Sequence, residues 1–275
     1  LVRVTRNPRF PMYVSLLTNV LNALFSGLGI YVFRLGIVGV ALGTVLARLI
    51  GVLILWRELD LSTIRWSWGL DGELLRLSLP AAGERLMMRA GDVVIIAIVV
   101  VFGTDAVAGN AIGEVLTQFN YMPAFGVATA TVMLVAHAVG EGDMQAVGLI
   151  RQRAFWLSFA CMLPLALGIF ALGRPLTLLY TDNSGAITAS LSVILFSLLG
   201  TPMAVGTVIY TAVWQGLGNA RLPFYATTIG MWLIRIVAGY VLGVTCGLGL
   251  PGVWAGTLLD NGFRWLFLKV LFDRK

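Results

Sequence analysis

Apolar runs of about 20 residues recur along the whole chain, separated by short stretches rich in Gly, Asp, Arg and Pro. A helix rises 1.5 Å per residue, so about 20 apolar residues cross the hydrocarbon core of a bilayer, which is about 30 Å thick. The ten-residue alternating segments typical of membrane β-barrels are absent from the sequence. We therefore expect an all-α polytopic membrane protein with eight transmembrane helices, at residues 11–32, 36–56, 80–102, 107–138, 154–173, 186–214, 224–245 and 251–271.

The one long connector between these runs, residues 57–79, mixes charged residues with Trp and Leu. This composition is typical of an amphipathic segment that lies at the membrane surface. It predicts a boundary between a short first part of the chain and a longer second part.

Two stretches near opposite ends of the chain resemble each other. The spacing Asn-x-Arg-x-Pro-x-Tyr occurs at residues 7–13 and 219–225, and the pattern Leu-Gly-x-x-Gly-Val-x-x-Gly-Thr occurs at residues 35–44 and 248–257. The offsets are 212 residues (219 minus 7) and 213 residues (248 minus 35). We interpret the match as an internal duplication. The two copies lie six crossings apart and so point the same way across the membrane, as in parallel-repeat transporters.

A repeat of this length predicts a transporter of twelve helices in two bundles of six. Residues 1–56 would hold the last two helices of the N-terminal bundle, 57–79 a cytoplasmic amphipathic linker, and 80–275 a complete C-terminal six-helix bundle. We therefore expect the sequence to be N-terminally truncated, which agrees with its start at Leu1 and its lack of a signal-peptide pattern.

The composition, 59% hydrophobic and 12% charged, excludes a soluble globular protein. Twelve Lys and Arg residues fall on one side of the predicted topology, whereas only Arg34 and Arg174 fall on the other. By the positive-inside rule both termini are expected in the cytoplasm. The net charge of +6 is explained by this topology and does not indicate a nucleic-acid partner.

Ionisable side chains inside the predicted spans are the strongest indication of function, because each costs about 2.5–3.5 kcal/mol at a helix centre unless it is paired or hydrated. Arg85, Arg89 and Asp92 are spaced to lie on one helical stripe and can pair along it. Glu84 lies off this stripe and has no partner at a favourable spacing on its own helix. Such a carboxylate could exchange a proton or bind a small cation. Alternatively, since it follows Pro80 by only four residues, it could simply reach water at the cytoplasmic end.

Asp260 and Arg264 are four residues apart and are expected to neutralise each other. The coupling-ion candidates are Glu84, Asp92 and Asp260. Five arginines are expected to be buried structural charges, some of them paired across helices: Arg48, Arg85, Arg89, Arg235 and Arg264.

Pro and Gly interrupt two predicted spans, at residues 123–126 and 200–206, and such breaks are tolerated in a membrane mainly where they line a cavity. Aromatic and Met side chains near the breaks suit flat lipophilic cations, although they could equally serve helix packing. The substrate-cavity candidates are Glu114, Gln118, Tyr121, Met122, Phe125, Met203, Tyr210 and Trp214.

Phosphate-binding Gly-Lys-Ser loops, metal-ligand spacings and nucleophile elbows are all missing from the sequence. We expect no enzyme activity, no cofactor and no metal site.

Several stretches together resemble the multidrug and toxic compound extrusion (MATE) family of drug/cation antiporters: Leu79-Pro80 followed by Glu84, Phe102 to Ile112 (FGTDAVAGNAI), Met122 to Gly126 (MPAFG), Leu179 to Asp182 (LYTD) and Gln215 to Pro223 (QGLGNARLP). The resemblance covers the whole chain, read as that family's fifth to twelfth helices. It implies a protein of the cytoplasmic (inner) membrane of a bacterium that exports cationic or amphiphilic organic compounds in exchange for H⁺ or Na⁺, by alternating access of two bundles. We expect it to be a monomer in the lipid bilayer.

Two alternatives stay open. A flippase of lipid-linked precursors in the same superfamily should have a cationic central cavity, which the arginines of the predicted spans favour. A non-transporting membrane scaffold would carry its buried charges only as structural pairs.

Overall fold

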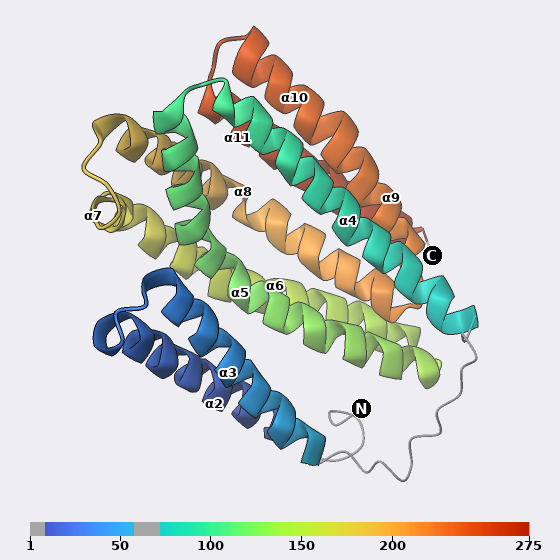
Figure 1. Ribbon diagram of the computed structural model, residues 1–275. Helices are drawn as coiled ribbons and strands as arrows, with labels where there is room; N and C mark the ends of the chain where they lie inside the picture. The colour runs from blue at the N-terminus through green and yellow to red at the C-terminus, as the bar shows by residue number, and fades with distance from the viewer. Residues whose placement is uncertain (1–8, 58–71, 275) are drawn as a thin grey trace. The chain divides into compact units, whose positions relative to one another are not determined.

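The computed structural model describes residues 9–57 and 72–274, and every regular element in these ranges is helical (Figure 1). The chain divides into two compact units, Leu1–Gly69 and Leu70–Lys275. Most of the predicted surface linker, residues 58–71, lies outside the described residues. The last residues of this linker, 72–79, are helical. The helix predicted to start at residue 80 begins at Gly72 and contains Pro80 in its interior.

The first unit is a helical hairpin made of α2 (Arg9–Gly27), a π-helical segment η1 (Leu28–Val32) and α3 (Gly36–Arg57). Small residues face the partner helix at four-residue spacing along α3: Gly39, Gly43, Ala47 and Gly51 are buried. A Cβ atom at residue 39 would lie 2.7 Å from the backbone of Gly29, so only glycine permits this approach. Close backbone packing through small residues is the usual way that helices associate in membranes.

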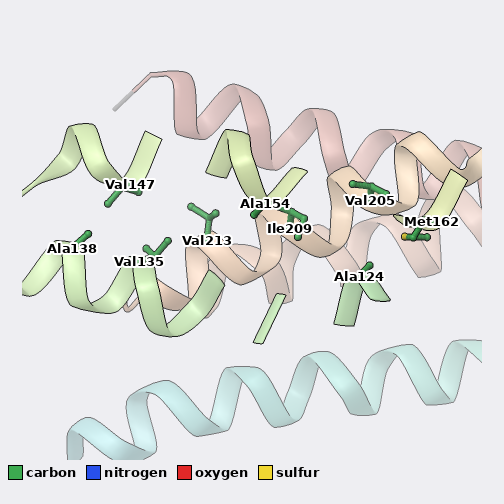
Figure 2. Packing of buried hydrophobic residues seen from close by; sticks show 9 residues of the cluster. All are labelled: Ala124, Val135, Ala138, Val147, Ala154, Met162, Val205, Ile209 and Val213. Carbon is green, nitrogen blue, oxygen red and sulfur yellow. The ribbon is translucent and has the colours of Figure 1, made fainter. Parts of the chain in front are cut away.

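The second unit holds all the remaining helices. They are α4 (Gly72–Val100), α5 (Thr104–Gly140), α6 (Met144–Ala171), α7 (Gly173–Leu178), α8 (Ser184–Gly216), the composite helix α9 (Arg221–Ile229), η3 (Gly230–Arg235), α10 (Ile236–Tyr240) and η4 (Val241–Thr245), and α11 (Leu250–Asp273). Within this unit α8 packs against α5, α6 and α11, while α4 packs against α9 (Figure 1). The largest apolar cluster joins α5, α6 and α8, and Figure 2 shows its members: Ala124, Val135, Ala138, Val147, Ala154, Met162, Val205, Ile209 and Val213.

Six helical stretches in the described part of the chain are long and apolar enough to cross a membrane. They coincide with all the predicted spans except those at residues 80–102 and 251–271. These two fall on α4 and α11, which are long helices but contain ionisable residues in their interiors. The less apolar character of α4 and α11 therefore comes from the side chains that the sequence marks as candidates for function.

The local backbone of the first hairpin recurs in the second unit at an offset of 213 residues (241 minus 28). The π-helical segments Leu28–Val32 and Val241–Thr245 are equivalent, and the glycines that follow them, Gly36 and Gly249, both have positive φ, at 56° and 64°. Equivalent backbone hydrogen bonds close both turns: Phe33 to Leu28 and Cys246 to Val241, and Leu35 to Gly29 and Leu248 to Leu242. The two hairpins thus share a local fold, as expected for copies of one ancestral unit.

Candidate functional site

Glu84 lies where three helices of the second unit meet, and its residue is only 8% exposed. One carboxylate oxygen accepts a hydrogen bond from the Thr227 hydroxyl on α9 at 3.1 Å. The other faces the side-chain amide of Gln215, in the last turn of α8, at 3.5 Å. Both partners are neutral, and Glu84 forms no ion pair among the described side chains. The charges of Arg85 and Arg264 act on it without ion-pair contact.

The local sequence brings these helices together. Gly83 precedes the glutamate, and a Cβ atom there would lie 3.0 Å from the ring of Phe224, so the missing side chain lets α4 approach α9. At the start of α9 the side chain of Asn219 accepts a hydrogen bond from the backbone N–H of Leu222 at 3.4 Å. These contacts place Thr227, one and a half turns further along α9, opposite Glu84.

Asp260 and Arg264 form the predicted pair within α11. The guanidinium Nη2 of Arg264 donates to Oδ2 of Asp260 at 2.8 Å, and both side chains are buried. Arg264 also donates to the side chain of Asn261 at 3.3 Å. Oδ1 of Asp260 and Nε of Arg264 have no hydrogen-bond partner among the described residues, so the pair is neutralised but not fully hydrogen-bonded.

Asp92 is shared between two arginines. Its carboxylate lies 3.6 Å from Arg89 on α4 and 3.4 Å from Arg235 in η3, and Arg235 also donates from Nε to the Thr257 hydroxyl of α11 at 3.0 Å. This is the cross-helix partner that the sequence leaves open for Arg235. Of the three predicted coupling candidates, Glu84 alone therefore lacks an ion pair in the described part of the chain.

The five arginines expected to be buried divide into two groups. Arg264 is buried and Arg235 is mostly covered, whereas Arg48, Arg85 and Arg89 are exposed on the surfaces of their own units. Arg85 and Arg89 are one turn apart on α4, about a quarter to two fifths of a turn around the helix from Glu84, so the rotation that buries Glu84 leaves them outside the bundle.

The substrate-cavity candidates also divide. Four lie at three- and four-residue spacing on one exposed face of α5: Glu114, Gln118, Met122 and Phe125. Tyr121 and Met203 are partly buried. Tyr210 and Trp214 lie in the core between α8 and α11, where Trp214 donates to the carbonyl oxygen of Leu268 at 3.1 Å and Tyr210 accepts a hydrogen bond from Arg151. Both side chains are buried in the described part of the chain.

Comparison with known families decides the class of protein. A family model named MatE matches residues 80–241, more than half of the chain. This chain belongs to the MatE family. The family resemblance predicted from the motifs is therefore confirmed.

Named relatives agree with the MatE assignment. The chain is 31% identical to a protein of Thermotoga maritima called "Probable multidrug resistance protein NorM", over 99% of this chain and 61% of the relative. It is 25% identical to "Uncharacterized transporter YisQ" of Bacillus subtilis, over 94% of this chain and 59% of that one. The MatE chain thus spans about three fifths of the length of these relatives. They are named as transporters or drug-resistance proteins, not as enzymes.

Solved structures show the same fold. One described as an outward-facing conformation of a multidrug resistance MATE family transporter matches with a TM-score of 0.85 at 20% identity, over 96% of this chain and 61% of that one. Another, a MOP superfamily transporter from Pyrococcus furiosus whose title reports a binding pocket of reverse polarity, matches with a TM-score of 0.84 at 20% identity, over 96% and 61% of the two chains. The predicted all-α polytopic membrane fold is confirmed for the MatE chain.

Sequence reasoning missed three polar residues of this MatE site: Gln215, Thr227 and Thr257. Gln215 begins one of the stretches that carry the family resemblance. The motif therefore singles out this residue, but nothing in the sequence indicates its contact with Glu84. The two threonines look like ordinary members of apolar helices, since a threonine hydroxyl commonly bonds to its own helix.

Proposed function

We propose that the complete protein is a secondary active antiporter that exports cationic or amphiphilic organic compounds in exchange for H⁺ or Na⁺ by alternating access. Membership of the MatE family and relatives named as multidrug resistance proteins support this function. The observation that carries it is the buried Glu84 carboxylate, whose described hydrogen-bond partners are all neutral.

An ionised carboxylate buried in a span is costly unless a positive charge accompanies it. Asp92 and Asp260 have arginines for this purpose, so their charge is balanced permanently. The charges of Arg85 and Arg264 act on Glu84 without ion-pair contact, so a bound proton or small cation would be needed to balance it directly. Loading on one side of the membrane and release on the other would then favour different conformations, which is the requirement for coupled exchange.

The organisation proposed for the complete protein follows the predicted repeat. Residues 1–56 supply the last two helices of an N-terminal bundle, 57–79 connect the bundles on the cytoplasmic side, and 80–275 form the C-terminal bundle. Both termini of the chain lie in the cytoplasm, and the protein acts as a monomer in the inner membrane of a bacterium.

The exposed stripe of α5 supports a substrate-facing role for that helix. It combines the carboxylate of Glu114 with the side chains of Gln118, Met122 and Phe125. A carboxylate next to an aromatic ring and a thioether suits an organic cation with a flat apolar body.

Proton-driven uptake of ethidium into everted vesicles, which corresponds to export from the cell, tests this function in vesicles that contain the complete gene product. Glu84→Gln keeps the size of the side chain and removes its charge, so proton-driven uptake should fall to the level of empty vesicles. Glu141→Gln is the matched control, because Glu141 lies in an exposed turn and pairs with His137 at 3.4 Å. Uptake that survives in Glu84→Gln removes this residue from the mechanism, and vesicles of the wild type that transport no tested compound contradict the proposed export.

A further inference from the structure

The exposed face of α4 carries two arginines that the proposed coupling mechanism does not use. Arg85 and Arg89 are one turn apart on this face, and the Arg89 side chain is 85% exposed. Further along the same face come only exposed apolar residues, Val93, Ile96 and Val100. The face thus presents two cations followed by an apolar track.

The positive charge on this face exceeds the negative charge that balances it. Among the described side chains, Asp92 is the acid in ion-pair contact with Arg89, and it is shared with Arg235. Glu84 acts on Arg85 through its charge without forming an ion pair. Of the two arginines that contact Asp92, Arg235 is the more firmly positioned. Its side chain is only 14% exposed and also donates a hydrogen bond to Thr257. Arg85 therefore has no acid in ion-pair contact in the described part of the chain, and Arg89 has only a share of Asp92.

An exposed arginine inside a span does not face lipid tails, because that placement costs at least about 2.5–3.5 kcal/mol at the centre of a helix. It needs water or an anion. The planar guanidinium group binds phosphate through two parallel hydrogen bonds, and two guanidinium groups one turn apart can hold one phosphate between them. The apolar residues beyond them match the tail of a molecule whose head is anionic.

We propose that Arg85 and Arg89 bind the anionic phosphate head group of a membrane lipid, with the lipid tail lying along Val93, Ile96 and Val100. The proposal goes beyond the proposed export of cationic compounds and does not depend on it. An anionic head group is also the polarity that the flippase alternative requires. Binding can be measured without transport, so the two proposals can fail separately.

The test is the association of spin-labelled lipids with the complete gene product, reconstituted in phosphatidylcholine vesicles. The wild type should restrict the motion of labelled phosphatidylglycerol more than that of labelled phosphatidylcholine. Arg85→Gln with Arg89→Gln should lower this preference by about fivefold for each arginine removed. Arg85→Gln alone, which leaves the contact between Arg89 and Asp92 intact, should show the single step. Lysine at both positions should retain part of the preference.

The matched control is Arg153→Gln with Arg221→Gln, which removes two exposed arginines from other helices. Loss of the preference in this control as well would mean a general attraction between the surface and anionic lipid, and would overturn the site. A preference that persists in the folded Arg85→Gln, Arg89→Gln variant would overturn it too. Inorganic phosphate should displace little of the labelled lipid, since it has no tail; full displacement would show a site for free anions instead of lipid.

Discussion

Gly230 lies so close to Asp260 that a Cβ atom at residue 230 would be 2.2 Å from Oδ1 of the carboxylate. The same atom would be 2.9 Å from Cγ of Arg264. Gly230 is also the first residue of η3, a π-helical segment, and such segments often occur at functional sites. The buried pair of Asp260 and Arg264 therefore fits beside η3 only because residue 230 has no side chain.

We expect Gly230→Ala to destabilise the protein by about 1–3 kcal/mol, the usual effect of overpacking a filled interior. Displacement of the carboxylate would also weaken its bond to Arg264. Thermal unfolding of the detergent-solubilised protein measures the change. Gly126→Ala in α5 is the control, since a Cβ atom there meets nothing within 4 Å and the helix should tolerate it. Equal melting temperatures for the two variants would contradict the described packing of Gly230.

A second prediction concerns the Asp260–Arg264 pair itself. Asp260→Asn should cost about 3–5 kcal/mol, because it leaves the buried guanidinium of Arg264 without a counter-charge. Adding Arg264→Gln should recover part of that loss, since the double variant buries no net charge. A double-mutant cycle on unfolding free energies gives the coupling. Additive losses in the cycle would mean that the two side chains do not depend on each other, against their distance of 2.8 Å.

The hairpins offer a test of the duplication. Gly39 in the first hairpin and Gly252 in the second occupy equivalent positions, and a Cβ atom at either would lie within 2.7 Å of the facing backbone. We expect Gly39→Ala and Gly252→Ala to loosen their hairpins alike, seen as faster hydrogen exchange of the backbone amides on both sides of the turn. Gly148→Ala in α6, where the added atom would meet open space, should leave exchange unchanged. Protection lost in one hairpin only would argue against equivalent packing.

The apolar runs, the polar stretches between them and the internal repeat were enough to predict the helices and the hairpins. This is because a bilayer requires every span to be apolar and of about the same length. The pair Asp260–Arg264 was also predictable, since both residues lie on one helix and their spacing alone brings them together. Partners on different helices were not. The contacts of Glu84 with Gln215 and Thr227, and of Asp92 with Arg235, depend on how α4 and the composite helix are rotated and shifted, which small residues such as Gly83 decide.

The same limit explains the arginines and the aromatic residues. The spacing of the charged residues on α4 is the same whether they face the interior or the exterior of the bundle. Arg85 and Arg89 face the exterior. Tyr210 and Trp214 were predicted to contact substrate because of their chemistry and a predicted helix break near Pro202, where α8 is in fact continuous from Ser184 to Gly216. Their position between α8 and α11 is set by neighbours such as Leu268, which no local pattern identifies.

Thr227 offers a test of the Glu84 site that leaves the carboxylate in place. Its hydroxyl is the nearer of the two donors to Glu84, at 3.1 Å, whereas the neighbouring Thr228 donates to the Phe224 carbonyl of its own helix at 2.8 Å. We expect Thr227→Val to slow coupled efflux by about tenfold, since hydrogen bonds to charged groups contribute about 1.5–3 kcal/mol. Thr228→Val should transport at close to the normal rate, and Thr227→Ser, which restores the hydroxyl, should recover most of the loss. If the two valine variants lose efflux equally, the effect is one of helix packing, and the hydrogen bond to Glu84 has no part in ion exchange.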